Sequence, residues 1–279
     1  MSDPLPPIPA TWRSTSTLPP EFELEPPDEF EPEDEPSVDL WSAVGQDRPW
    51  VTASLLLSWC ALFAAMGLAR ELGDVASDLR WGALPSGHDG CIAPWRWLAY
   101  TGIHGNIVHL VSNGFTMVIL GPAVERIFTR AHLALLFASG AIAGAWGTLM
   151  WQGYAHPERS IVSIGASGAV FALGGALLAA AWRLRHRLAP SRARALAASI
   201  LWLVVPGIAI GFSKPEIGSA AHVGGFAGGL AAGLVLGLDP RLGVRPPARA
   251  TRILGVLAGV ALAATYVASL VMGEWRGGR

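Results

Sequence analysis

The sequence has little charge and few cysteines. Only 15% of its 279 residues are Asp, Glu, Lys or Arg, whereas soluble domains usually carry about 25%. Two cysteines are too few for a disulfide scaffold. A formal net charge of −1, with no basic stripe outside the ends of the expected helices, argues against nucleic acid as a partner. The composition therefore argues against a soluble domain, a disulfide-rich domain and a nucleic-acid-binding protein.

Long apolar runs dominate what is present. Seven stretches of about 19 to 28 residues contain no Asp, Glu, Lys or Arg. Each is long enough to cross a hydrocarbon core of ~30 Å as a helix. The sequence predicts an all-α fold, a polytopic membrane helical bundle. The expected spans are residues 50–69, a segment between 96 and 125, and residues 131–154, 161–182, 195–212, 217–238 and 253–273.

The first 49 residues have a different composition. They hold 12 of the 21 acidic residues and 11 of the 21 prolines. Such a segment buries too little apolar surface to offset its ordering entropy. We expect a disordered cytoplasmic tail at 1–49, although a docking peptide for a cytoplasmic partner fits the same composition. Residues 50–238 are expected to form a six-helix membrane domain, and residues 239–279 a linker and a seventh helix.

The distribution of Lys and Arg predicts the orientation. With the N-terminus in the cytoplasm, the cytoplasmic segments carry 13 of the 20 basic residues and the external segments carry 7. Cytoplasmic loops of membrane proteins are enriched in Lys and Arg. Seven spans therefore predict a cytoplasmic N-terminus and an external C-terminus.

Polar residues inside the spans are candidates for function, because burying them in lipid is costly. They comprise His104, His109 and Asn113 in the second span, Ser163 and Ser167 in the fourth, and His222 in the sixth. Three of them, His109, Ser167 and His222, lie 16 or 17 residues before the charged inner end of their span, or ~24–26 Å along a helix. The three side chains are thus expected at one depth near the outer face.

Residue types at this depth indicate nucleophilic catalysis. Serine needs a base to accept its proton, and neutral histidine is the usual base. His222 is the available partner for Ser167, and no carboxylate lies at the same level to orient it, which favours a dyad over a triad. Gly225 and Gly229 follow His222 on one helix face, and Gly168 follows Ser167. Small residues let membrane helices approach closely, and plain helix packing explains these glycines equally well.

The motifs around these residues resemble the rhomboid intramembrane serine proteases. Residues 165–168 read Gly-Ala-Ser-Gly, similar to the G-x-S-G motif of the family. Residues 221–229 match A-H-x-x-G-x-x-x-G, and residues 104–113 match H-x-x-x-x-H-x-x-x-N. The similarity covers about residues 51–238, and a span after the sixth resembles the six-plus-one branch.

The resemblance implies a role for each matching residue. Ser167 is the expected nucleophile and His222 its base, while His109, Asn113 and the Ser167 amide form the oxyanion hole. Supporting positions are His104, the Trp95-Arg96 pair of the first external loop, Glu125 at the inner end of the second span, and Gly165, Gly168, Gly225 and Gly229. Glu125 suits a helix-end ion pair better than a functional acid. Many relatives place a glycine near position 129, where this chain has Thr129.

The function so implied is hydrolysis of peptide bonds in or next to transmembrane segments of other membrane proteins. Neither a metal nor a cofactor is expected. The expected location is the plasma (inner) membrane of a bacterium, and the expected partners are transmembrane substrates and the lipid bilayer. The alternative is a non-catalytic rhomboid-like factor that binds or escorts transmembrane clients. A zinc protease would need H-E-x-x-H, and an aspartyl type would need two Asp residues within the spans; neither pattern is present.

Overall fold

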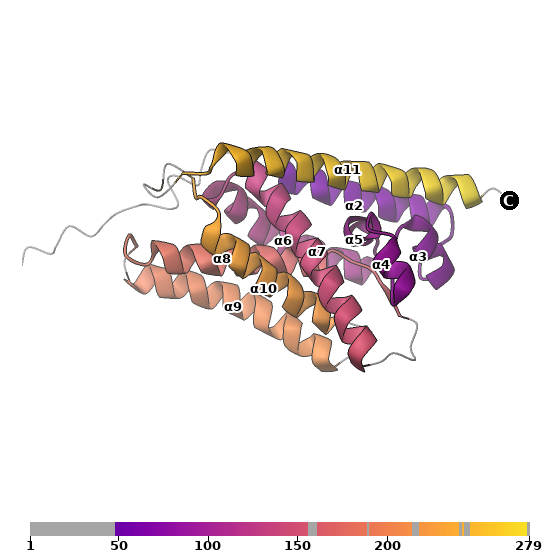
Figure 1. Cartoon of the computed structure of the whole chain (residues 1–279), viewed down its shortest axis with the longest axis horizontal. Coiled ribbons are helices and arrows are strands. Elements are labelled where there is room, and N and C mark those ends of the chain that lie inside the picture. Colours follow the sequence, from indigo (N-terminus) through magenta and orange to yellow (C-terminus); the bar gives the residue numbers. More distant parts are fainter. Residues whose placement is uncertain are drawn as a thin grey trace, which may run out of the picture. The chain divides into compact units, whose positions relative to one another are not determined.

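A computed structural model describes residues 48–155, 161–188, 190–213, 218–239, 242 and 246–277. Long helices make up most of these residues (Figure 1). They are α2 (Trp50–Leu68), α6 (Ile107–Ile127), α7 (Arg130–Ala155), α8 (Ser167–Leu184), α9 (Pro190–Ser213), α10 (Ser219–Val235) and α11 (Arg249–Gly277). The tail expected at 1–49 lies almost wholly outside the described residues.

Six of the described helices are long and apolar enough to cross a membrane. They are α2, α6, α7, α8, α9 and α11, and α10 is a shorter apolar helix of 17 residues. Each of the seven expected spans therefore corresponds to one helix. The protein is an all-α, polytopic membrane helical bundle, as the sequence predicts.

One expected helix start is wrong. The sequence predicts a fourth span from about residue 161, but Val162–Ser163 forms the short strand β2, which pairs antiparallel with β1 (Leu84–Pro85). Gly165 then takes a positive φ of 106°, which an α-helix does not allow, and α8 begins at Ser167. Ser163 consequently lies in a strand and not in a span.

The second span also begins later than the apolar run. Residues 96–102 form the short helix α5 (Arg96–Ala99) and the 3-10 turn η3 (Tyr100–Gly102). The side chain of Asn106 accepts a hydrogen bond from the backbone N–H of His109 at 2.9 Å, and this N-cap starts α6 at Ile107. His104 therefore lies before the helix, in an irregular segment.

The connection between α2 and α6 folds into a small structured region. It contains α3 (Val75–Trp81), β1, α4 (His88–Ile92), α5 and η3. Asp74 caps α3 by accepting from the N–H of Ser77 at 2.8 Å, and Gly82 ends it in a left-handed conformation. The side chain of Trp81 is fully buried. Capping and burial thus fix this loop beside the helices.

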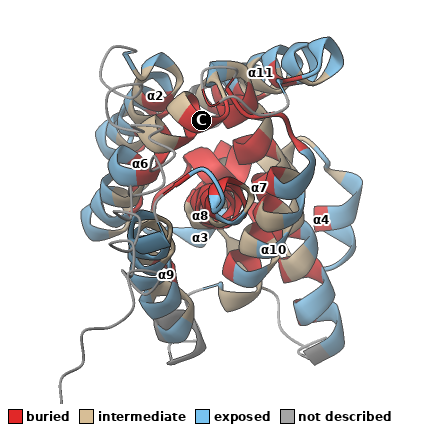
Figure 2. Cartoon of the chain, turned by 90° about the vertical axis from the view of Figure 1, so that its left-hand side faces the viewer, coloured by how far each residue is buried: buried red, intermediate tan, exposed pale blue. Residues whose placement is uncertain are grey.

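The centre of the bundle is α8, around which α6, α7, α9 and α10 are arranged (Figure 2). Within its apolar window 78% of the residues are buried, compared with 28% in α2 and 28% in α11. Its residues are mostly Ala, Gly and Leu, which allow neighbours to pack closely on every side. α11 packs on α7 and α2 at the other side of α7 from α10 (Figure 1).

Candidate active site

The first residues of α8 are held in place by η3. The backbone N–H of Gly165 donates to the carbonyl of Tyr100 at 2.9 Å. A Cβ at Gly165 would collide with the imidazole of His109, and its φ of 106° is one that side chains other than glycine rarely adopt. Only glycine therefore fits two residues before Ser167. This turn brings the start of α8 against the first turns of α6.

α8 and α10 pack backbone against backbone. A Cβ on Gly225 would meet the carbonyl oxygen of Gly168, and one on Gly229 would meet that of Ala172. One turn further, a Cβ on Gly233 would lie 2.7 Å from the Cα of Ala176. The spacing of four residues on both helices keeps small residues facing each other along the seam. We call these three contacts the α8–α10 seam.

The opposite end of the same helix pair is held by Arg183. Its Nη1 donates to the carbonyl of Gly233 at 2.8 Å and to that of Leu236 at 2.5 Å. These carbonyls belong to the last turn of α10, where backbone acceptors have no partner within the helix. Arg183 thus ties the C-terminal end of α8 to that of α10.

At the end of the seam away from Arg183, Ser167 and His222 meet. The Nε2 atom of His222 lies 2.8 Å from the Oγ of Ser167, which is hydrogen-bonding distance. His222 is buried, with 5% of its surface exposed, while Ser167 is partly exposed. A serine hydroxyl in contact with a neutral imidazole is the arrangement that allows proton transfer from the nucleophile.

The imidazole of His222 is oriented by an aromatic ring. Phe171 stacks on it with 4.3 Å between ring centroids and an angle of 4° between the planes. The backbone of Gly207 in α9 interacts with the imidazole electrostatically. The Nδ1 atom nevertheless has no hydrogen-bond partner with acceptable geometry among the described residues. Among the described residues, the ring of Phe171 and the backbone of Gly207 are thus the neighbours that hold the imidazole in place.

Sequence reasoning missed Phe171 and Tyr100. Phe171 is four residues after Ser167 and so lies on the same helix face, a spacing that was visible in the sequence. Tyr100 contributes a carbonyl to Gly165, and its buried hydroxyl donates to the carbonyl of Ala141 in α7 at 3.0 Å. No spacing rule connects Tyr100 to residues more than 40 positions away, so this contact required the fold.

The histidines around α6 form a chain of rings. His104 is fully buried, its ring centroid 5.1 Å from that of His109 and 5.6 Å from that of Trp59 in α2. Asn113 is also buried, and its Nδ2 donates to the carbonyl of His109 at 3.1 Å. The structure thus places His109 beside the turn before Ser167, while the Asn113 amide is bonded to its own helix.

Arg96 holds the loop that precedes α6. Its Nη1 donates to the carbonyls of Leu79 and Ala83, at 2.7 and 2.6 Å, and its guanidinium lies 4.7 Å from the ring centroid of Trp95. Five N–H donors in a fixed plane suit such a multiple contact. The Trp95-Arg96 pair therefore acts on the loop and has no direct contact with Ser167 among the interactions described.

Glu125 lies about 16 residues along α6 from His109, or ~24 Å. Its Oε1 accepts hydrogen bonds from the N–H and the hydroxyl of Thr52, both at 2.7 Å. Its Oε2 is 3.8 Å from Nε of Arg130, a long ion pair at the start of α7. The carboxylate therefore joins α2, α6 and α7 at the end of the bundle away from the serine.

Comparison with known proteins agrees with this geometry. Residues 93–239 match the rhomboid domain, which is more than half of the chain. The chain belongs to the rhomboid family. The matched residues include α8 with Ser167 and α10 with His222.

Individual relatives include both a named protease and an inactive protein. RHOMBOID-like protein 4 of Arabidopsis thaliana is 32% identical over 53% of this chain and 36% of its own length. Rhomboid protease GluP of Bacillus subtilis is 30% identical over 62% of this chain and 31% of its own length. Inactive RHOMBOID-like protein 8 of Arabidopsis thaliana is 30% identical over 75% of this chain and 65% of its own length. The rhomboid chain described here thus spans between about a third and two-thirds of the length of these relatives.

Proposed function

We propose that this rhomboid is an intramembrane serine endopeptidase that uses a Ser167–His222 dyad. The observation that carries the proposal is the 2.8 Å contact between His222 Nε2 and Ser167 Oγ. In the reaction, His222 accepts the hydroxyl proton while Oγ attacks the scissile carbonyl carbon. The proton then passes to the leaving amine, and a water molecule hydrolyses the acyl-enzyme with His222 again as base.

The oxyanion of the tetrahedral intermediate needs hydrogen-bond donors. We assign this role to the backbone N–H of Ser167, at the first residue of α8, and to the side chains of His109 and Asn113. The start of a helix favours negative charge because its N–H groups point outward. Asn113 donates to the His109 carbonyl in the present structure, so its amide must turn toward the substrate when the intermediate forms.

The substrates we propose are transmembrane segments of other proteins, cleaved within or next to the bilayer. Membership of a family that includes named proteases supports this class of substrate. Ser167 and His222 both belong to apolar helices of the bundle, which also supports a substrate within the bilayer. We place the protein in a bacterial plasma membrane, with the N-terminus cytoplasmic and residues 1–49 as a tail outside the catalytic unit of 50–238.

Activity of the purified protein on a model transmembrane substrate tests the proposal. Ser167→Ala and His222→Ala should each abolish cleavage, and the double variant should be no worse than either, because the two residues act as one unit. Ser163→Ala is a matched control, since Ser163 lies in β2 and makes no described contact with His222. A fluorophosphonate probe should label Ser167 in the wild type and nothing in Ser167→Ala.

A second outcome would favour a non-catalytic role. One relative carries the name of an inactive rhomboid-like protein, so a bundle of this kind does not by itself establish proteolysis. If the folded wild type neither cleaves transmembrane substrates nor reacts with the probe, the protein binds or escorts such clients instead. If Ser167→Ala retains wild-type cleavage, the dyad assignment is wrong.

A further inference from the structure

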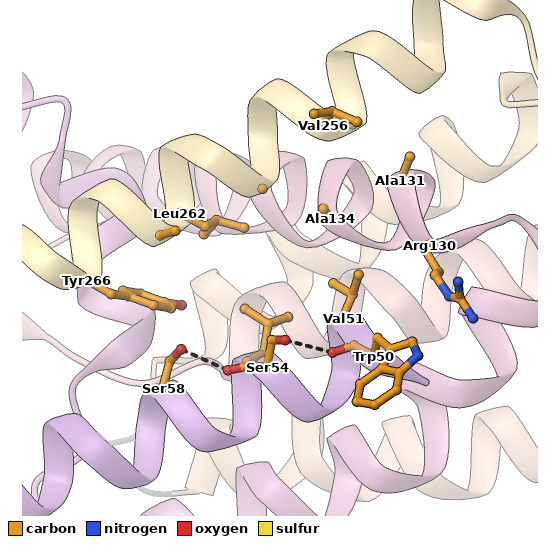
Figure 3. A pocket seen from close by; sticks show the side chains of 14 residues that line it. Trp50, Val51, Ser54, Ser58, Arg130, Ala131, Ala134, Val256, Leu262 and Tyr266 are labelled. Carbon is orange, nitrogen blue, oxygen red and sulfur yellow. Dashed lines mark hydrogen bonds between the residues drawn. The ribbon is translucent and has the colours of Figure 1, made fainter. Parts of the chain in front are cut away.

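A groove runs between α2, α7 and α11, lined by none of the residues assigned to catalysis. Its cavity volume is about 460 Å³. Figure 3 shows Trp50 and Arg130 at one end, Ser58 and Tyr266 at the other, and Val256 of α11 along the side. We call it the α2–α11 groove. Its lining includes four small residues of α7 and α11, which are Ala131, Ala134, Gly255 and Gly259.

The interior of the groove offers few free polar groups, because the hydroxyl groups along it already make hydrogen bonds within the protein. The hydroxyls of Ser54 and Ser58 donate to the carbonyls one turn earlier in α2, both at 2.8 Å. The Tyr266 hydroxyl lies 2.7 Å from Oγ1 of Thr101. Hydrocarbon therefore fits the interior of the groove better than a polar ligand does.

The length of the groove matches half a bilayer. Its lining on α11 extends from Gly255 to Tyr266, which is ~16 Å at 1.5 Å per residue. The hydrocarbon core of a membrane is ~30 Å thick, so the groove is as long as one leaflet. Trp50, at the start of α2, and Arg130, at the start of α7, both lie at the same end of the groove.

Charge at that end points to a phosphate. The Arg130 side chain is half exposed, and only its Nε faces Glu125, at 3.8 Å, while one Nη donates to the carbonyl of Arg48 at 3.2 Å. A guanidinium has further donors, which suit the oxygens of a phosphate. Arg252 is exposed in the first turn of α11. Its charge acts on His132, which follows Arg130 by two positions in α7. Trp50 is exposed as well, as aromatic residues at membrane interfaces usually are.

We propose that the α2–α11 groove binds one phospholipid, with an acyl chain along the groove and the phosphate at Arg130. The guanidinium of Arg130 at one end favours a phosphate over the apolar face of a transmembrane helix, which brings no anion to this position. A single acyl chain is narrower than a helix and as long as one leaflet. The groove thus fits a lipid in size, polarity and charge.

Photocrosslinking tests the proposal without using proteolysis as a readout. The full chain is placed in nanodiscs that contain phosphatidylglycerol with a diazirine near the end of one acyl chain. We expect crosslinks concentrated at Ser58, Leu262 and Tyr266, which line the deep end of the groove. Arg130→Gln should weaken this labelling by about tenfold or more, because it removes charge-assisted hydrogen bonds to the phosphate.

A second variant, which fills the groove, tests the space for the acyl chain separately from the charge of Arg130. Ser54→Leu with Ser58→Leu fills the groove and leaves no buried donor unpaired, because both hydroxyls bond only their own helix. It should abolish labelling at Leu262 and Tyr266. Ala61→Leu is the matched control, since Ala61 is an exposed residue of α2 that does not line the groove, and it should label like the wild type.

Two results would overturn the proposal. Labelling spread evenly over Leu57, Val260 and the groove, and unchanged in the groove-filling variant, would mean ordinary surrounding lipid only. Displacement of the label by a single-span helical peptide, with no effect of Arg130→Gln, would assign the groove to a transmembrane helix of another protein.

Discussion

Thr129 lies between α6 and α7 with a backbone φ of 141°, a region that residues with a side chain adopt only under strain. Its Oγ1 accepts a hydrogen bond from the N–H of His132 at 3.3 Å, which partly caps α7. This backbone geometry explains why glycine, the residue expected near this position from the resemblance to rhomboids, would fit here without strain.

Thr129→Gly should raise the stability of the protein. Relief of the strained φ is worth ~1–3 kcal/mol, whereas replacing a threonine cap by glycine costs only a few tenths. We expect a net gain of about 1 kcal/mol, seen as a higher midpoint of thermal unfolding in detergent micelles. Thr129→Ala is the control: it keeps the strain and loses the cap, so its midpoint should fall. A fall for Thr129→Gly would show that the hydroxyl matters more than the backbone.

Asp78 gives the protein a pH dependence outside the membrane-spanning helices. Burial, assisted by the nearby charge of Asp74, raises the pKa of its carboxyl to about 6 from an ordinary value of 3.8, and its Oδ1 has no partner among the described residues. The folded protein therefore holds the proton more tightly than the unfolded chain does. Stability should fall as the pH rises from about 4 to about 6 and stay lower above that.

Asp78→Asn should remove this loss. The variant keeps the shape of the side chain without its charge, so it should unfold at a higher temperature than the wild type at pH 7.5 and at the same temperature at pH 4. Asp89→Asn, in the exposed part of α4, is the control and should follow the wild type at both pH values. Equal unfolding midpoints for Asp78→Asn and wild type at pH 7.5 would contradict the burial of a charge at this position.

At the scale of the helices, the α8–α10 seam sets the distance between Ser167 and His222. Gly225→Ala and Gly229→Ala each add a methyl group that runs into a carbonyl oxygen of α8. Overpacking of this kind costs typically 1–3 kcal/mol, and the helices must separate to relieve it. We expect lower unfolding midpoints and slower reaction of Ser167 with a fluorophosphonate probe, even at temperatures where the variants remain folded.

Gly153→Ala is the matched control for the seam, because a Cβ there meets no atom within 4 Å. It should not lower the unfolding midpoint and should react with the probe like the wild type. Unchanged probe reactivity in folded Gly225→Ala would mean that the seam does not control the distance between the two side chains.

The positions of the seven helices were predictable, because their apolar runs lack charge and their lengths match the bilayer. Their starts were less so. Residues 161–166 are apolar and read as helix, but the pairing of β2 with β1 and the positive φ of Gly165 exclude them from α8. The pairing partner, Leu84–Pro85, is almost 80 residues away, and no local pattern indicates it.

The candidate site was predictable from the sequence only in part. The depth of Ser167 and His222 follows from counting residues to charged helix ends, and the glycine spacing indicates which faces meet. The stacking of Phe171 and the bond of Asn113 to His109 depend on rotamers, which a sequence pattern does not specify. The neighbours of the site in space, such as Tyr100, were beyond the reach of spacing arguments.

For the whole molecule, seven helices place the two termini on opposite sides of the membrane if each one crosses it. We predict that the N-terminus is cytoplasmic. Both native cysteines are exposed and free, so the test begins from a Cys60→Ala, Cys91→Ala background. In right-side-out vesicles, an impermeant maleimide should label a Gly277→Cys variant and not a Pro20→Cys variant. Labelling of both on the same side would mean that one helix, with α10 the shortest candidate, does not cross.

The close helix contacts also limit how this protein can be engineered. Stabilisation of a soluble domain often proceeds by filling internal space with larger apolar side chains, but α7, α8 and α10 approach through glycines that have no smaller replacement. A Cβ on Gly140, Gly147 or Gly224 would meet α8, α10 or α7 closely, just as one in the seam would. Mutant libraries designed to raise the stability of the protein should therefore leave the glycine-containing faces of α7, α8 and α10 unchanged. Their gains are to be sought in the connections, at positions such as Thr129 and Asp78.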